Sequence, residues 1–183
     1  MSIFLKLKAW QMFVLIIAPM FMPMFMFRGP EGLKWFGLIT LIWILVLVGW
    51  LYAVGSRSNS KLPDNLRKNT LIYRLGFAVA VFYAGLMAVA VFPNMELPVN
   101  QPPAPPVWLV PLHLTSMFGM FYGLWFTAKQ FVTLQKDQNV KFIDYSGPFF
   151  LFWFSPIGVW FLQPRINEIL GEDGHNNAPQ PTE

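Results

Sequence analysis

Cysteine is absent from the chain, and charged residues are scarce. Without cysteine there can be no disulfide bond and no thiolate metal site. Only 12% of the 183 residues are charged, whereas soluble domains carry about 25%. Instead, 55% of the residues are hydrophobic and the mean hydropathy is +0.47. A soluble domain of this length has too much surface to hide so many apolar side chains, so the composition predicts a membrane protein.

Acidic residues are missing from every long apolar stretch. Four stretches approach the roughly 20 residues that cross a bilayer: Ala9 to Phe27, Trp35 to Val54, Thr70 to Phe92 and Trp108 to Ala128. We expect helices, because a single apolar segment in lipid must satisfy its backbone groups internally. The sequence therefore predicts an all-α, polytopic transmembrane helical bundle. It forms one domain over residues 1–164, followed by an acidic, disordered tail at 165–183.

The lack of acidic groups also limits the chemistry that the interior can perform. Proton- and cation-coupled pumps usually need buried carboxylates. The sequence holds no glycine-rich phosphate loop, no metal-spaced histidine cluster and no nucleophile–base set. Asp64, Asp137 and Asp144 fall in polar connectors, where we expect them to be solvated. We therefore predict a protein that is not an enzyme and has no cofactor, with an enzyme that acts on lipids as the last alternative. Its short basic loops do not indicate nucleic-acid binding.

A fifth apolar segment is too short for an ordinary crossing. Between Pro148 and Pro164 lie 15 residues without a charge, which make about 22 Å of helix against a hydrocarbon core of about 30 Å. We favour a short, aromatic fifth span over residues 148–163, kinked at Pro156, with the tail outside. The alternative is a re-entrant hairpin bent at "SPIG" that returns the tail to the cytoplasm.

The basic residues predict the orientation, because cytoplasmic loops of membrane proteins are rich in Lys and Arg. The N-terminus and the connectors 55–69 and 129–147 together hold nine of them, while the connectors 28–34 and 93–107 hold two. The N-terminus is therefore expected in the cytoplasm. The connector "PNMELPVNQPPAPPV" is expected outside, as an extended polyproline segment.

The segment "FIDYSGPFFLFWFSPIGVWFLQPRIN", residues Phe142 to Asn167, resembles the C-terminal part of small, uncharacterised multi-pass membrane proteins of bacteria. The resemblance implies a location in the bacterial inner (cytoplasmic) membrane. It includes no catalytic motif and assigns no functional residue.

Small residues recur every four positions in two neighbouring spans. These positions share one face of a helix, and membrane helices use such faces for close backbone contact. We therefore predict that the two antiparallel spans pack on each other along these stripes, unless one stripe receives another subunit. The residues are Gly76, Ala80, Ala84 and Ala88 in one span and Thr115, Gly119, Gly123 and Thr127 in the next.

Two ionisable residues and four methionines are candidate ligand contacts. Arg74, near the start of the third span, could bind an anion or a lipid headgroup, although its long side chain can also reach the membrane surface. His113 could titrate, but we expect it to be hydrogen bonded to Thr115, a carbonyl or water. Thioethers are soft Cu(I) ligands, so a copper site is a minor possibility at Met20, Met22, Met24 and Met26.

These patterns favour one function and leave two alternatives. The leading hypothesis is a non-catalytic accessory or assembly subunit, surrounded by lipid, that packs against other integral membrane subunits or a second copy of itself. A small oligomeric transporter or channel for a neutral or anionic solute, with Arg74 and His113 along its path, is the alternative. Cu(I) handling is the minor one.

Overall fold

The chain is helical throughout the part that the computed structural model describes, residues 2–26, 31–94 and 106–171. Helices account for 85% of these residues, and there is no strand among them. In chain order the elements are the 3₁₀ turn η1 (Ser2–Leu5), α1 (Ala9–Met26), α2 (Glu31–Lys61), α3 (Leu71–Leu86), the π-helical turn η2 (Met87–Val91), the 3₁₀ turn η3 (Phe92–Asn94), α4 (Leu109–Lys136), α5 (Phe142–Trp153) and α6 (Ser155–Leu170).

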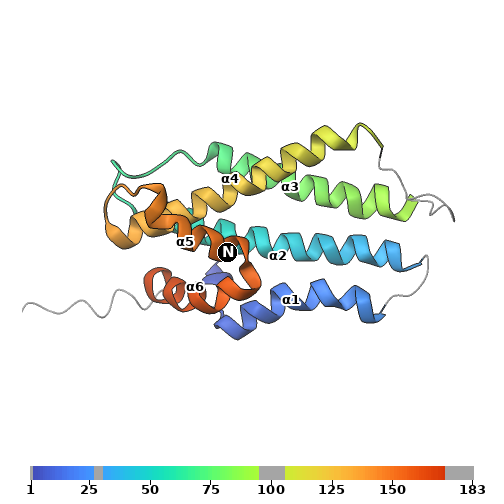
Figure 1. The fold of residues 1–183 in the computed structure, drawn as a ribbon, viewed down its shortest axis with the longest axis horizontal. Helices are drawn as coiled ribbons and strands as arrows, with labels where there is room; N and C mark the ends of the chain where they lie inside the picture. The colour runs from blue at the N-terminus through green and yellow to red at the C-terminus, as the bar shows by residue number, and fades with distance from the viewer. Residues whose placement is uncertain (1, 27–30, 95–105, 172–183) are drawn as a thin grey trace, which may run out of the picture.

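Four helices run along the length of the molecule and form a bundle around α2, which contacts α1, α3 and α4 (Figure 1). Among the described residues, three helices are long and apolar enough to cross a membrane: Trp35–Lys61, Leu71–Val91 and Leu109–Lys136. The apolar part of α1, Ala9–Met22, is shorter. The structure therefore has the all-α character expected from the sequence, but it does not have four long spans plus a fifth.

The helices α2 and α4 are longer than the hydropathy predicts. Each continues about two turns beyond the expected ends at Val54 and Ala128, to Lys61 and Lys136. These extra turns are built from residues of mixed polarity, yet many of them are buried against neighbouring helices. Tertiary packing therefore stabilises helix where the apolar sequence has already ended. The proline-rich connector lies mostly outside the described residues, since 95–105 are not among them.

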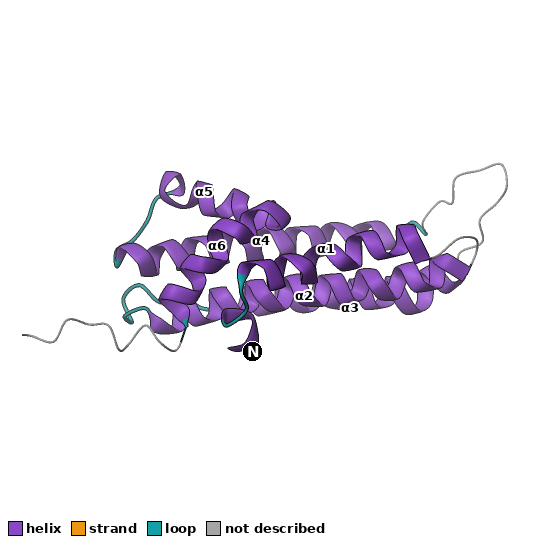
Figure 2. Ribbon diagram, turned by 90° about the horizontal axis from the view of Figure 1, so that it is seen from below, coloured by secondary structure: helices purple, strands orange, loops and turns teal. Residues whose placement is uncertain are grey.

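The fifth apolar segment is a hairpin of two short helices, and the prediction of a single kinked span is wrong. The helix α5 ends at Trp153, Phe154 has non-helical backbone angles (φ −87°, ψ 53°), and α6 begins at Ser155. The hairpin lies alongside one half of the bundle only (Figures 1 and 2). Its α5 arm has 12 residues, or about 18 Å of helix, too short to cross a core of about 30 Å.

Pro156 and Gly158 explain why the chain breaks and turns at this point. Pro156 has no backbone N–H to continue α5, but it fits the first turn of α6. The carbonyl of Phe154 then accepts bonds from the N–H groups of Ile157 and Gly158, at 3.0 and 2.8 Å, which starts the new helix. Gly158 packs directly on the backbone of α5: an added Cβ would lie 1.7 Å from the Leu151 carbonyl oxygen.

The helix α6 continues past residue 164, where the sequence predicts the end of the folded domain. Pro164 lies inside α6, and the helix continues to Leu170. Ile166 and Leu170 are buried, so residues 165–170 belong to the folded domain and not to a tail. Lys61, at the end of α2, donates a 2.8 Å hydrogen bond to the Ile169 carbonyl, so α6 ends beside α2. Residues 172–183 lie outside the described part.

A charged pair fixes the start of the hairpin at the end of α4. Lys136 donates a hydrogen bond to Asp144 and forms an ion pair with it. The Lys141 backbone N–H donates to the other carboxylate oxygen at 2.9 Å, as an acidic residue in the first turn of a helix commonly allows. The Lys136 ammonium group, and then this N–H, hold the pKa of Asp144 below its ordinary value.

We predict that Gly158→Ala opens the hairpin, whereas Gly147→Ala does not. A methyl group at 158 meets the α5 backbone, which cannot give way as a flexible side chain does, so the protein should lose at least about 3 kcal/mol of stability. Nothing lies within 4 Å of a Cβ at 147, and alanine there should add about 0.5–1 kcal/mol through its helix preference. Thermal unfolding in detergent measures both. Equal melting temperatures would contradict the backbone contact.

Acid should weaken the ion pair and the hydrogen bonds that Asp144 forms. Its pKa is depressed in the folded state, so the unfolded chain binds protons more readily there. The stabilisation is therefore complete above the unfolded pKa of about 3.9 and is lost as pH falls through the lower folded pKa. Melting temperatures measured from pH 7 to pH 2.5 should fall less steeply for Asp144→Asn than for the wild type. Asp137→Asn, which leaves the Lys136–Asp144 pair intact, should keep the wild-type slope.

Candidate functional site

A buried amide joins the hairpin to the N-terminal segment and to α2. Gln163 is fully buried, and its Oε1 accepts a 2.9 Å hydrogen bond from Trp50 Nε1. Its Nε2 lies 2.7 and 3.0 Å from the carbonyl oxygens of Phe4 and Leu7, and Asn167 Nδ2 also donates to Leu7 at 3.0 Å. We call these five residues the amide latch. It satisfies carbonyls before α1 that no helix pairs, and it holds the two ends of the described chain together.

A second buried polar cluster joins α2, α3 and α4. Tyr73 is fully buried; its hydroxyl donates to the Leu51 carbonyl at 2.8 Å and lies 3.1 Å from Thr127 Oγ1. Its ring stacks on Phe126 and Tyr52, with centroids 4.3 and 5.7 Å apart. Thr127, predicted as a helix-packing residue, therefore also links α4 to the backbone of α2 by a 3.3 Å hydrogen bond.

The two small-residue stripes meet at one crossing of α3 and α4. Gly76 and Gly119 are in backbone contact, because a Cβ on Gly119 would lie 2.6 Å from the Gly76 carbonyl oxygen. One turn further along α4, Gly123 leaves room for the ring of Phe77. These two helices have the most extensive contact of any pair in the bundle.

The remaining stripe residues lie elsewhere. Ala88, which lies in the π-helical turn at the end of the stripe, packs against Gly37 of α2. Ala80 and Ala84 are buried and line a cavity between α2, α3 and α4. Thr115 is exposed, and its hydroxyl bonds back to the helix. The stripes therefore serve several contacts and do not run against each other along their whole length.

An apolar groove opens on the surface beside the glycine crossing. Its volume is about 710 Å³, and α3 and α4 form most of its walls. Leu75 and Phe118 are 55% and 72% exposed, and Val79, Tyr122 and Trp125 are among the other residues that line it. We call these five residues the α3–α4 groove. The two glycines allow the helix axes to approach closely, and their missing side chains leave this depression between the larger neighbours.

His113 lies in a different hollow and pairs with a tyrosine. Its Nδ1 is 3.0 Å from the Tyr83 hydroxyl, while the Thr115 hydroxyl donates to the Pro111 carbonyl at 2.7 Å. The partner of Nδ1 is therefore a tyrosine, which is not among the expected partners Thr115, a carbonyl or water. The His113–Tyr83 pair forms the polar rim of an apolar cavity of about 390 Å³, which the hairpin reaches through Trp153.

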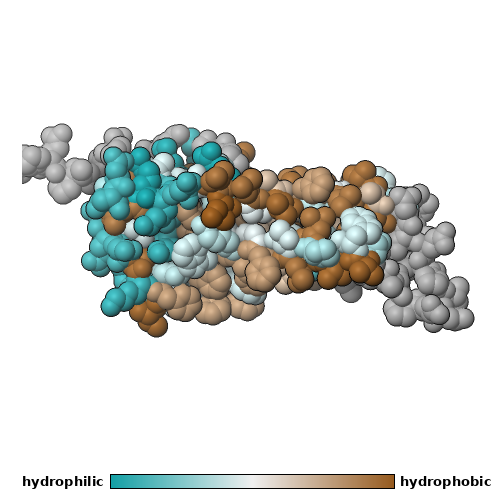
Figure 3. Space-filling view, turned by 90° about the horizontal axis from the view of Figure 1, so that it is seen from above, coloured by the Kyte–Doolittle hydropathy of each residue, from teal (hydrophilic) through white to brown (hydrophobic). Residues whose placement is uncertain are grey.

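Hydrophilic residues gather at one end of the molecule, which we call the polar end (Figure 3). Arg74 lies in the first turn of α3. It lines a hollow of about 440 Å³ with Lys6, Ser56, Arg57 and Ser60. We call these five residues the basic hollow. Arg74 and His113 line separate hollows, so the described chain does not bring them together along one solute path.

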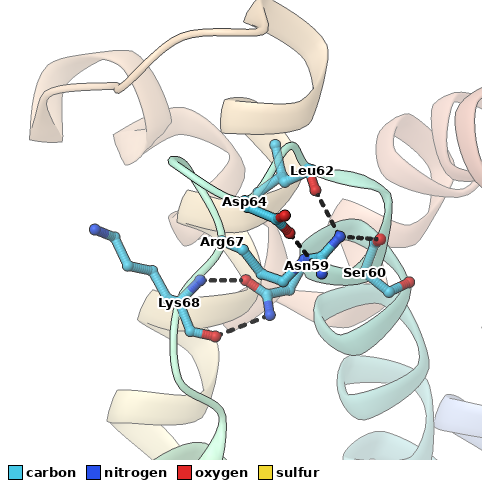
Figure 4. A network of polar contacts seen from close by, with 6 residues as sticks. All are labelled: Asn59, Ser60, Leu62, Asp64, Arg67 and Lys68. Atoms are coloured by element: carbon cyan, nitrogen blue, oxygen red, sulfur yellow. Dashed lines mark hydrogen bonds and ion pairs between the residues drawn. The ribbon is translucent and has the colours of Figure 1, made fainter.

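The turn after α2 forms one wall beside the basic hollow (Figure 4). Asn59 and Lys68 exchange two hydrogen bonds between the Asn59 amide and the Lys68 backbone, at 2.9 and 3.0 Å. Arg67 donates to the carbonyls of Ser60 and Leu62, at 3.2 and 3.0 Å. These carbonyls end the helix and have no helical partner, so Arg67 serves as a cap.

The proposed copper ligands are only partly within the described side chains. Met20 and Met22 lie on α1 and are 61% and 44% exposed, and the side chains of Met24 and Met26 are outside the described part. In the described ranges, no group of three or more His, Cys, Asp or Glu residues is placed to hold a metal ion.

Comparisons of the chain with protein-family models, curated proteins and solved structures find no match. Any function must therefore be argued from the residues and their geometry.

Sequence reasoning missed the amide latch and Arg57. A signal was available for Gln163, because an amide that directly follows a long apolar run must find hydrogen-bond partners if it is buried. The sequence does not predict which residues those partners are, because they lie more than 100 residues away. The sequence predicts a connector at Arg57, whereas this residue lies on α2 and lines the basic hollow together with Arg74.

We predict that Gln163→Leu is far more damaging than Gln130→Leu. The first change leaves Trp50 Nε1 and the Phe4 carbonyl without the partner that Gln163 provides, whereas the Leu7 carbonyl keeps its bond from Asn167. This loss should cost about 2–4 kcal/mol. Gln130 is 1% exposed, and its Oε1 has no partner among the described residues. Leucine there should therefore change stability by less than about 1 kcal/mol. Thermal unfolding gives the stability, and trypsin should cut after Lys6 and Lys8 faster only in Gln163→Leu.

Proposed function

We propose that the protein is a non-catalytic integral membrane subunit that assists or assembles a complex in a bacterial inner membrane. It would act by presenting a shaped apolar surface to a transmembrane helix of another subunit or of a second copy. The α3–α4 groove is the observation that carries this proposal, because it is an apolar depression along two helices in the part of the chain suited to lipid.

The proposed topology has four crossings and one half-crossing. α1 has 18 residues, about 27 Å of helix, which a small local thinning of the bilayer accommodates. The hairpin enters and leaves at the polar end. With the N-terminus in the cytoplasm, as the basic residues favour, residue 171 then faces the cytoplasm as well. The prediction that the tail lies outside required a fifth crossing of the membrane, which this proposed topology does not contain.

The groove is a better binding surface for a partner helix than the small-residue stripes themselves. In the membrane, helix association depends on close packing and not on the hydrophobic effect. Gly76 and Gly119 already use their small size within the chain. The exposed rims Leu75 and Phe118, by contrast, offer ridges on either side of a depression into which a partner's side chains can pack.

Filling the groove should release the partner. We expect the wild type, extracted in mild detergent from its native membrane, to retain a stoichiometric membrane partner or to form a defined homo-oligomer. Val79→Trp occupies the groove and should reduce recovery of that partner at least tenfold, or about 1.4 kcal/mol. Val89→Trp is the matched control, because Val89 is on the continuation of the same helix, 69% exposed and outside the groove. A wild-type monomer without partners, or equal recovery from both variants, would contradict the proposal.

A further inference from the structure

The basic hollow gathers positive charge from three separate elements. Lys6 precedes α1, Arg57 lies on α2 and Arg74 lies on α3, and together they surround a space of about 440 Å³. Among the described residues that line it, none is acidic. The like charges of Arg57 and Arg74 in one space repel each other, and an anion bound between them reduces that repulsion.

Other basic side chains at this end already have hydrogen-bond or ion-pair partners. Arg67 caps α2 and forms an ion pair with Asp64 at 3.0 Å. Lys61 donates a hydrogen bond to the Ile169 carbonyl of α6. These bonds neutralise the negative C-terminal ends of both helices. Arg57 and Arg74, by contrast, have no ion pair anywhere in the described ranges. Their guanidinium groups remain available for a ligand.

A buried hydroxyl points to a ligand at the same place. Ser56 Oγ is buried and has no hydrogen-bond partner within the described part of the chain. The same serine lines both the basic hollow and an adjoining hollow of about 370 Å³, as Ser60 and Arg74 also do. A buried hydroxyl without a partner is unfavourable, and Ser56 lines the same hollow as two arginines, so a ligand in this space would find a hydrogen-bond donor beside positive charge.

The adjoining hollow adds the positive end of a helix. It is lined by Asn69 and Thr70, which directly precede the first turn of α3. Helix N-termini favour anions through their free N–H groups and the helix dipole. Apolar residues also line the basic hollow, among them Leu5, Ala53 and Leu170. The space therefore offers both charged and hydrophobic contacts.

We propose that the basic hollow binds a phosphate group, with Arg57, Arg74 and Lys6 compensating its charge and Ser56 donating a hydrogen bond. Arginine matches phosphate because its planar group presents paired donors. The phosphate belongs either to an anionic phospholipid of the adjacent leaflet or to a soluble phosphate compound. This site is distinct from the α3–α4 groove, so it does not depend on the proposed subunit role.

Binding of two probes to the full chain in a non-ionic detergent tests the site. The probes are inorganic phosphate and short-chain phosphatidylglycerol, with phosphatidylcholine of equal chain length as the net-neutral control. Saturable binding of phosphatidylglycerol alone assigns a lipid headgroup, and binding of both assigns a soluble phosphate source as well. Binding of neither, or equal binding of phosphatidylcholine, overturns the proposal.

Single substitutions separate a built site from general positive charge. Arg57→Gln and Arg74→Gln should each weaken binding about tenfold. Arg165→Gln removes the same charge from an exposed position outside both hollows and should leave binding unchanged. Ser56→Ala keeps every charge and should weaken binding about threefold. All variants are first required to match the wild type in elution volume and ligand-free melting temperature. If Arg165→Gln weakens binding as much as Arg74→Gln does, or Ser56→Ala has no effect, the assigned site is wrong.

Discussion

The contact between Gly158 and the Leu151 carbonyl determines the direction of the last helix, α6. With no side chain at 158, α6 lies directly on the backbone of α5 and runs back toward the polar end. Gln163 is then carried to Trp50 and to the free carbonyls before α1. Leu170 is placed beside the basic hollow by the same return. The amide latch and part of the proposed phosphate site therefore both follow from one close approach of two helices.

Hydropathy predicts the helices well because a backbone in lipid has almost no other way to satisfy its polar groups. α1 begins at Ala9 as expected. The ends of α2 and α4 are not predictable in this way, because their last turns are stabilised by neighbours and not by apolar sequence. Pro156 is ambiguous for a further reason. A kinked span and a broken hairpin lose the same backbone hydrogen bond, and only the tertiary contact at Gly158 decides between them.

The candidate sites show the same division between local and distant information. The four-residue spacing of small residues correctly marks positions of close approach, since the spacing is a property of one helix. It does not state the partner, which is Gly119 for Gly76 but α2 for Ala88. Arg74 is visible in the sequence as an unusual charge. Its neighbours Arg57 and Ser56 are not, because hydropathy placed them in a connector while the structure continues them as helix.

The hairpin also gives the molecule an uneven cross-section. In a bilayer, α1 to α4 would occupy both leaflets, while α5 and α6 would add their area to one leaflet only. Such a wedge displaces more lipid from the leaflet that contains the hairpin. The packing of the surrounding lipids is least disturbed where the membrane curves so that this leaflet is expanded. A protein of this shape should therefore gather at curved regions of its membrane, and its density there would depend on the lateral pressure of a single monolayer.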